Sequence, residues 1–162
     1  MRVVAEHIRK KFNRRPVFKD ISFIIEPGEV FGITGRNGSG KSTLLRIVGG
    51  LLSPSGGSLR FSHGGRDVLP ENLYRHIGYV APYLTLYEEF SAEENIALYA
   101  RIRGLKYSAR DAQTLLERVD LPVDRKDPIR AYSSGMKQRM RLVFAILHQP
   151  PLLLLDEPVS NL

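Results

Sequence analysis

A glycine-rich segment that ends in a lysine and a hydroxyl is the part of this sequence best suited to chemistry. Residues 35–42 read GRNGSGKS and satisfy the pattern G-x-x-x-x-G-K-[ST]. Glycines let such a loop curl until its backbone N–H groups converge on phosphate oxygens. The ammonium of Lys41 would then lie at the β- and γ-phosphates of a nucleotide, and the hydroxyl of Ser42 would be a ligand for Mg²⁺.

The setting of this loop gives the pattern mechanical meaning. The apolar run 29–34 (EVFGIT) precedes the loop and predicts a buried strand, and residues 41–51 predict a helix that stops at a Gly-Gly pair. The start of that helix would add its unpaired N–H groups and its dipole to the phosphate site. The alternative is a glycine-rich turn that matches by chance, and the strand–loop–helix order disfavours it. The predicted phosphate-binding residues are Gly35, Asn37, Gly38, Ser39, Gly40, Lys41, Ser42 and Thr43.

Two carboxylates follow a run of four leucines near the end of the chain. Residues 152–157 read LLLLDE, which predicts a buried strand that ends at Asp156 and Glu157. Alone, this pattern could be a strand that ends in acids for solubility. The carboxyl ends of parallel strands meet at the edge where ligands bind, so Asp156 would hold Mg²⁺ beside the loop. Glu157 would orient or deprotonate an attacking water, which makes Glu157 and Lys41 the predicted catalytic residues.

Strands and helices alternate along the rest of the chain. Short strands are predicted over 2–8, 21–25, 58–61, 77–80 and 152–155. Helical spacing begins at Ala92, with Ile96 and Ile102 on one face and Gly104 as the stop. A second helix begins after Ser108, and a third, capped by Ser133 or Ser134, runs to Leu147. This order predicts an α/β fold, with the helix-rich stretch 91–148 inserted in the sheet.

Composition bounds the class of protein. The chain has 162 residues, enough for one domain over 1–162, and a formal charge of +7, which favours anionic partners. It has no cysteine, which excludes disulfides, thiolate nucleophiles and cysteine-ligated metals. Its four histidines form no spaced pair, so no metal site built from protein ligands alone is expected. The sequence shows neither a membrane-spanning run nor a signal peptide, and we expect a cytoplasmic protein.

Four acidic residues cluster in the middle of an otherwise basic chain. They are Glu88, Glu89, Glu93 and Glu94. One interpretation is a set of solvated helix and loop faces, and the other is a surface for a basic partner segment.

Taken together, these segments resemble the ATP-binding subunit of ABC transporters. The resemblance rests on GRNGSGKST at 35–43, YSSGMKQR at 132–139 and LLLLDEP at 152–158, in the family's order and approximate spacing. The middle motif is similar to the family signature LSGGQ followed by KQR. Tyr132, Ser134 and Met136 depart from that signature, and such a variant is familiar in exporter-like members.

The resemblance implies a fold, a ligand and partners. The implied fold is a P-loop NTPase with a mostly parallel core sheet, an N-terminal antiparallel β portion and an inserted α-helical subdomain. ATP with Mg²⁺ would lie between two subunits, with Ser133 and Gly135 of one subunit contacting the γ-phosphate held by the other. Phe12 would stack on adenine with Val17 beside it, although either residue could instead belong to the core.

Two departures from the family qualify this expectation. Pro82 occupies the position of a glutamine that ligands Mg²⁺ and senses the transmembrane partner. The sequence stops at Leu162, soon after the second carboxylate motif, so we expect a truncated chain that lacks the C-terminal strands, exposes a sheet edge and hydrolyses ATP poorly by itself.

The function expected from this resemblance is ATP hydrolysis that powers transport through a separate transmembrane permease subunit, with the direction of an exporter. The protein would form a head-to-tail dimer and lie on the inner face of the cell membrane through the permease, and nucleic acid is not an expected partner. One alternative is a soluble ABC ATPase that acts on nucleic acid or ribosomes, supported by the charge of +7. Another is a nucleotide-binding regulator with little turnover.

Overall fold

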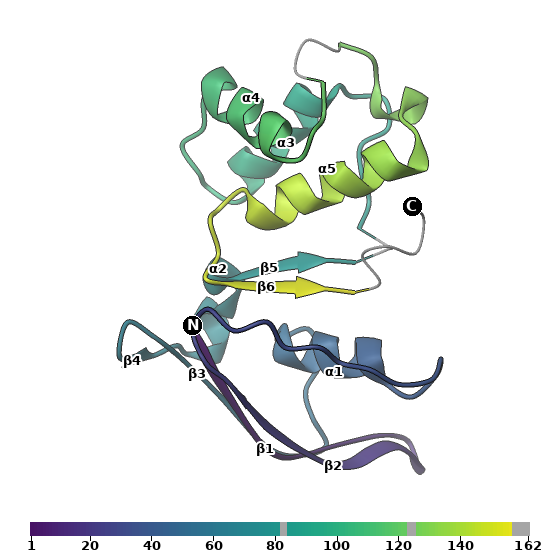
Figure 1. Ribbon diagram of the computed structural model, residues 1–162, viewed down its shortest axis with the longest axis vertical. Helices are drawn as coiled ribbons and strands as arrows, with labels where there is room; N and C mark the ends of the chain where they lie inside the picture. The colour runs from purple at the N-terminus through teal and green to yellow at the C-terminus, as the bar shows by residue number, and fades with distance from the viewer. Residues whose placement is uncertain (82–83, 123–125, 157–162) are drawn as a thin grey trace. The chain divides into compact units, whose positions relative to one another are not determined.

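The structure, a computed structural model, describes residues 1–81, 84–122 and 126–156. The chain divides into two compact units, Met1–Ile77 and Gly78–Leu162. The mixed α/β content, with an antiparallel N-terminal sheet and a parallel strand pair, confirms the predicted fold class (Figure 1). The single domain expected over 1–162 stays a prediction.

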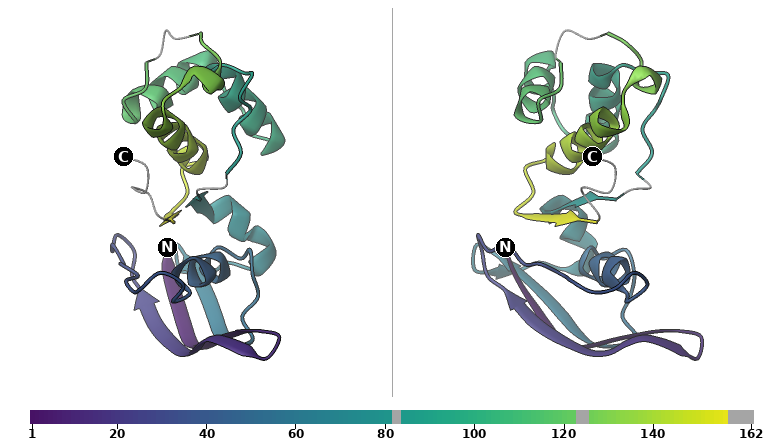
Figure 2. Two further views of the ribbon diagram at one scale, coloured as in Figure 1. Left: turned by 90° about the vertical axis from the view of Figure 1, so that its right-hand side faces the viewer. Right: turned by 45° about the vertical axis from the view of Figure 1, so that its right-hand side comes forward.

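A four-stranded antiparallel sheet forms the first unit. Its strands are β1 (Arg2–Phe12), β2 (Arg15–Ile25), β3 (Gly56–His63) and β4 (Arg66–Asp67), in the order β2-β1-β3-β4 (Figures 1 and 2). The predicted strands 2–8 and 21–25 are confirmed and are longer than expected. Pro16 does not interrupt β2 because β2 is an edge strand, where proline is tolerated.

Helix α1 (Lys41–Val48) lies beside one face of this sheet (Figures 1 and 2). Leu44, Ile47 and Val48 are its buried residues, and Gly49 is its C-cap, so the predicted start and glycine stop are confirmed. The unit ends with the 3₁₀ helix η1 (Pro70–Asn72) and the short helix α2 (Leu73–His76).

The run 29–34 is the main error of the sequence-based fold. It is not part of a strand, and Val30 and Phe31 are 97% and 42% exposed. Phe31 instead stacks on Phe23, with ring centroids 5.0 Å apart. An apolar run becomes a strand only when a neighbour offers a backbone ladder, and periodicity says nothing about that neighbour.

In the second unit, β5 (Ile77–Val80) and β6 (Leu152–Leu155) lie side by side and run in the same direction (Figure 1). Between them in sequence are α3 (Ala92–Ile102), α4 (Ala109–Arg118), the 3₁₀ helix η2 (Ile129–Ala131) and α5 (Ser134–Ile146). The three longer helices pack into one hydrophobic cluster.

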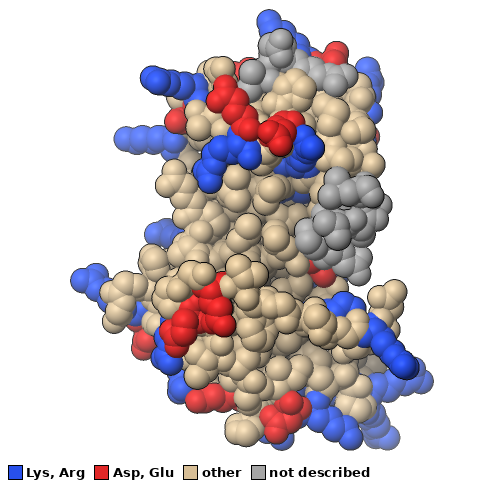
Figure 3. All heavy atoms as spheres, viewed as in Figure 1, with Lys and Arg blue, Asp and Glu red and all other residues tan. Residues whose placement is uncertain are grey.

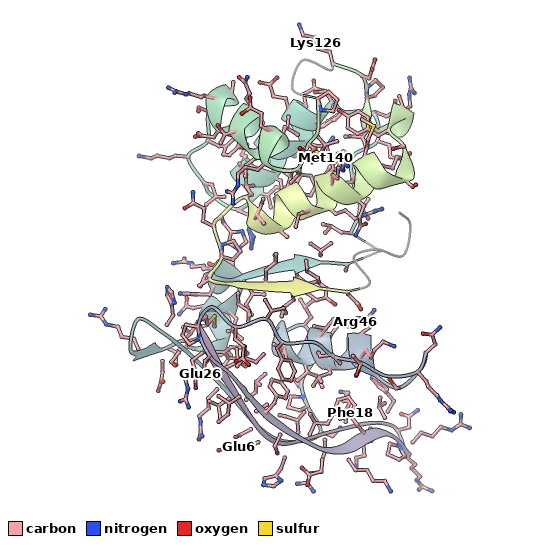
Figure 4. The ribbon with its side chains drawn as sticks, viewed as in Figure 1. Glu6, Phe18, Glu26, Arg46, Lys126 and Met140 are labelled. Atoms are coloured by element: carbon pink, nitrogen blue, oxygen red, sulfur yellow. The ribbon has the colours of Figure 1, made fainter. Side chains whose placement is uncertain are left out.

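The helices of this cluster begin where local chemistry predicts. Ser108 caps α4 in a capping box, and Ser133 rather than Ser134 caps α5. Met140 points from α5 into the cluster and is fully buried (Figure 4). The predicted apolar face of α3 is partly wrong because Ile96 is buried whereas Ile102 is 64% exposed.

Candidate functional site

The glycine-rich loop turns back on itself just before α1. The N–H of Ser39 donates to the carbonyl of Arg36 at 3.1 Å, and the N–H of Leu44 donates to the carbonyl of Gly40 at 2.9 Å. Gly40 is the N-cap and has a φ of 99°, in the left-handed region that glycine adopts without strain. The loop residues Gly35, Asn37, Gly38 and Ser39 are exposed, whereas Lys41, Ser42 and Thr43 are half-buried in the first helical turn.

The Lys41 ammonium lies over its own loop. Its Nζ donates to the carbonyls of Gly35 at 3.0 Å and of Arg36 at 3.1 Å. An ammonium carries three N–H donors, one more than these two bonds use. The positive charge is thus held at the inside of the curl, where a phosphate group would be cradled.

The start of α1 adds a second source of positive potential. The first N–H groups of a helix have no partner within the helix, and Gly40 has no side chain with which to cap them. Donors of this kind, together with the helix dipole, bind anions. The structure therefore brings the lysine and the helix start to one place.

Close contacts connect this loop to β2. A Cβ at Gly40 would lie 2.6 Å from Cγ1 of Val17 and 3.1 Å from Cδ1 of Phe18, so only glycine fits there. Val17, expected beside the adenine, thus lies against the phosphate loop. Phe18 was not singled out from the sequence; it points from β2 toward the side where α1 lies (Figure 4). Its position after Val17 in an apolar strand was the available signal.

Phe12 lies at the end of β1, away from the core. Its side chain is 51% exposed, and the Nζ of Lys10 lies 4.9 Å from the centre of its ring. The alternative of a core role for Phe12 is therefore wrong. An exposed ring can stack on a flat aromatic ligand.

Asp156 directly follows β6, as the sequence predicts, although Leu153 and Leu155 of the strand predicted to be buried are 38% and 41% exposed. Asp156 is 4% exposed, its N–H donates to the carbonyl of Val80 at 2.9 Å, and its Oδ2 accepts from the hydroxyl of Tyr79 at 3.3 Å. Glu157 and Pro82 lie outside the described residues.

Carboxylate and hydroxyl oxygens, as on Asp156 and Ser42, are ligands that suit Mg²⁺. Within residues 1–81, 84–122 and 126–156, no group of three or more His, Cys, Asp or Glu could hold a metal ion. Mg²⁺ bound to a nucleotide needs only one or two protein ligands, because phosphates and waters complete its shell. Ser42 and Asp156 belong to different units, and each of them separately offers an oxygen of the kind that a nucleotide-bound Mg²⁺ takes.

The segment 132–136 lies at the start of α5. Ser133 is exposed, and its Oγ accepts from the N–H of Met136 at 3.2 Å. Tyr132 is 5% exposed, and Met136 packs against the helix cluster. Two of the departures from the family signature thus face the core, whereas Ser133 is open to solvent and Gly135 is half-buried.

Three of the four glutamates of the acidic cluster form ion pairs or hydrogen bonds within the second unit. Glu88 pairs with Lys137 at 2.7 Å, and Glu89 pairs with Arg130 at 2.8 Å. Glu94 accepts from the N–H and the hydroxyl of Ser91 in the capping box of α3. These contacts give three of the four carboxylates an internal role and favour a structural interpretation of the cluster.

Comparison with protein families gives one extended match. Residues 18–160 match the family model described as ABC transporter. The relatives include the linearmycin resistance ATP-binding protein LnrL of Bacillus subtilis (strain 168), 35% identical over 98% of this chain and 51% of LnrL. The lantibiotic transport ATP-binding protein SrtF of Streptococcus pyogenes is 33% identical over 97% of this chain and 66% of SrtF. The chain spans about half the length of the first curated relatives it matches.

Solved structures agree in fold. An ATP-binding subunit of an ABC transporter superposes with a TM-score of 0.81 at 30% identity, over 99% of this chain and 68% of that one. A dimeric ATP-binding cassette in a post-hydrolysis state, bound to ADP and Pi, superposes with a TM-score of 0.81 at 26% identity, over 99% of this chain and 75% of that one. Within the described part of this chain, no helix is long and apolar enough to span a membrane.

Proposed function

We propose that this chain, which belongs to the ABC transporter family of ATP-binding proteins, binds and hydrolyses ATP with Mg²⁺ and powers transport through a separate membrane subunit. The observation that carries the proposal is the Lys41 ammonium, bonded to two loop carbonyls beside a helix start that has no side-chain cap. Backbone donors and one cation in this arrangement suit a polyphosphate.

Each predicted residue has a role in this proposal. The loop residues Gly35, Asn37, Gly38, Ser39, Gly40 and Thr43 would surround the phosphates together with Lys41. Phe12 would stack on the adenine, with Val17 at its edge. Ser42 and Asp156 would hold Mg²⁺, which would draw charge from the phosphate oxygens, and Glu157 would orient the attacking water.

The proposal includes a second copy of the chain. Ser133 and Gly135 would contact the γ-phosphate held by the other subunit. A serine hydroxyl can accept from the Met136 N–H and still donate its own proton to a phosphate oxygen, so the cap of α5 need not break. The similar ATP-binding cassette that is dimeric and bound to ADP and Pi supports the presence of a second copy.

The membrane partner and the direction of transport are also proposed. Relatives named for resistance and for lantibiotic transport support an exporter. The surface proposed for the permease is the segment Tyr87–Arg103, which includes a stacked pair of rings, Tyr87 and Phe90, that are 48% and 40% exposed. Exposed neighbouring aromatic side chains suit a protein interface.

The test uses the full-length gene product. Isothermal titration with ATP·Mg²⁺ should show saturable binding, and a steady-state assay should show hydrolysis. Glu157→Gln should retain ATP binding, stop turnover and trap the dimer. Normal hydrolysis by this variant would show that Glu157 is not the catalytic carboxylate, and binding without turnover in the unsubstituted protein would favour a regulator.

A second candidate function is an ABC ATPase that acts on nucleic acid. A groove of about 500 Å³ on the first unit is lined by Arg9, Lys10, Lys11 and Lys19, together with Pro16, Phe18 and Ser55. Lys and Arg side chains gather over the end of the β1–β2 hairpin, at the lower right of Figure 3. Binding to nucleic acid should weaken steeply as salt is added, because phosphate contacts release counterions. RNA or DNA binding with this salt dependence would favour the second candidate over transport.

A further inference from the structure

Asn95 is a fully buried polar residue of α3 that the proposed nucleotide chemistry does not use. Its Oδ1 accepts from the N–H of Tyr87 at 3.0 Å. Its Nδ2 donates to the carbonyls of Tyr87, Phe90 and Ser91 at 2.9, 3.2 and 2.9 Å. One side chain therefore holds both ends of the loop 87–90.

That loop is bonded in turn to the segment before α5. The N–H of Ile129 donates to the carbonyl of Phe90, and the N–H of Arg130 donates to the carbonyl of Glu88, each at 2.9 Å. Phe90 thus receives bonds from Asn95 on one side and from Ile129 on the other. The loop lies between the buried amide and the 3₁₀ helix η2.

The segment leads directly into the start of α5. The N–H of Tyr132 donates to the carbonyl of Ile129 at 3.0 Å, and Ser133 follows as the N-cap. The ion pair of Glu88 with Lys137 ties the same loop to the first turns of α5, and the Lys137 side chain is only 23% exposed. Hydrogen bonds therefore run from Asn95 to the end of α5 that carries Ser133 and Gly135.

The hydrogen bonds to loop 87–90 need a short side chain that both accepts and donates. An asparagine amide offers both an acceptor and two donor protons at short range, and here both kinds are used. Removing the amide would leave the Tyr87 N–H without its acceptor and would take one donor each from the carbonyls of Tyr87, Phe90 and Ser91 around a buried side chain, where unmade bonds are costly. The loop would have to shift, and the segment bonded to it would shift as well.

We propose that Asn95 is a positioning residue that, through loop 87–90, fixes the end of α5 that faces the second subunit's phosphate. The proposal deepens the proposed function and rests on it. It assigns no contact between Asn95 and the nucleotide, so ATP affinity at the phosphate loop should not depend on Asn95.

The main test is Asn95→Asp, which has nearly the same shape. Asp keeps the acceptor oxygen but replaces the NH₂ group, with its two donor protons, by a second carboxylate oxygen that faces three carbonyls. In the full-length protein, ATP binding by the monomer should stay within about twofold, whereas ATP-dependent dimerisation and kcat should each fall about tenfold. Protonation at lower pH gives the carboxyl one donor again, so the ratio of variant to wild-type kcat should rise from roughly pH 8 to pH 6.

Two further variants separate positioning from loss of stability. Leu115→Ala, in α4 of the same hydrophobic cluster, should lower the melting temperature without this selective loss of dimerisation. Glu88→Lys and Lys137→Glu should each weaken dimerisation, and the charge-exchanged double variant should restore it. If Asn95→Asp does not fold, this charge exchange tests whether loop 87–90 positions the start of α5.

The outcomes distinguish the two proposals. If the wild-type protein binds no ATP, the proposed function fails. If the wild-type protein binds ATP and dimerises, but Asn95→Asp dimerises and turns over equally well, the positioning role is overturned. The positioning role is also overturned if Leu115→Ala loses as much dimerisation for the same loss of melting temperature, or if the charge exchange gives no recovery.

Discussion

The starts of α1 and α5, one in each unit, are built in opposite ways. Helix α1 begins at Gly40, which has a φ of 99° and no side chain to offer a cap. Helix α5 begins at Ser133, whose hydroxyl accepts from the N–H of Met136. Helices α3 and α4 resemble α5, because Ser91 and Ser108 cap them in capping boxes.

This difference shows that the start of α1 is not built for the greatest helix stability. A serine cap contributes about 1 kcal/mol, and α1 does without it. What α1 has instead is the ammonium of Lys41, bonded to the carbonyls of Gly35 and Arg36. A helix start without a side-chain cap suits an external anion, whereas the Ser133 hydroxyl of α5 accepts from a backbone N–H and can still donate its own proton to a ligand.

Lys41→Ala should have the largest effect on the difference between the starts of α1 and α5. The α1 site loses its cation, and charge-assisted bonds to phosphate are strong, so the Kd for ATP·Mg²⁺ should rise about 100-fold or more. Isothermal titration measures this change. Lys106→Ala removes an exposed lysine from the second unit and should leave affinity unchanged. Retained affinity in Lys41→Ala would contradict the phosphate assignment.

Gly40→Ala tests whether the open start of α1 requires glycine. The new Cβ would lie 2.6 Å from Val17 in a left-handed conformation, so the loop must move. ATP affinity should fall about tenfold, and the free energy of unfolding should fall by about 1–3 kcal/mol. The matched control is Gly28→Ala, with a φ of 82° and nothing within 4 Å of the added Cβ. Gly28→Ala should lower the free energy of unfolding without lowering ATP affinity. Equal ATP affinities of Gly28→Ala and Gly40→Ala would exclude the contact with Val17 as the cause of the loss.

Ser133→Ala sharpens the contrast from the side of α5. Loss of the cap should cost about 1 kcal/mol of unfolding free energy, and loss of the hydroxyl should weaken ATP-dependent dimerisation about fivefold. ATP binding by the monomer should not change. Ser108→Ala removes the cap of α4 at a similar cost in stability and should leave dimerisation intact. Equal dimerisation of the two variants would limit Ser133 to capping.

The smallest effect expected is on acid stability. Hydrogen bonds from the backbone and side chain of Ser91 lower the pKa of Glu94 below its usual 4.5, and those from the side chain and backbone of Ser108 lower the pKa of Asp111 below its usual 3.8. Because both pKa values are lower in the folded chain, this stabilisation is complete above the unfolded values and is lost as pH falls through the folded values.

Glu94→Gln checks this assignment because glutamine can also close a capping box. Far-UV circular dichroism between roughly pH 5 and pH 2.5 should show a smaller acid-induced loss of helix in the variant than in the wild type. The start of α1 has no carboxylate in its first turn, so it should not contribute to this loss. An identical acid transition in both proteins would remove Glu94 as a source.

Local chemistry made several parts of the fold predictable. Ser108 and Ser133 cap their helices, and Gly49 ends α1, because capping depends on residues within one turn. Asp156 ends a four-leucine strand as expected. These predictions needed no knowledge of distant neighbours.

Predictions that depended on neighbours failed or were never made. The run 29–34 has the apolar content of a strand, yet Val30 is exposed, because a strand needs a ladder partner that the run itself cannot specify. Ile102 has the right spacing for the buried face of α3 and is exposed near the end of that helix. Asn95 reads as a polar interruption, and its four hydrogen bonds are visible only in the folded chain.

By itself, the sequence determined the parts of the proposed phosphate site, because the curl, the cation and the helix start all come from the consecutive residues 35–43. Only the tertiary structure decided that Val17 and Phe18 contact Gly40. It also decided that loop 87–90, which Asn95 holds by hydrogen bonds, is bonded to the segment before Ser133. The physical reason is range. Turns and caps form between near neighbours. The contacts of Gly40 with β2, and those of loop 87–90 with Ile129 and Arg130, join residues more than twenty positions apart, and topology alone chooses such partners.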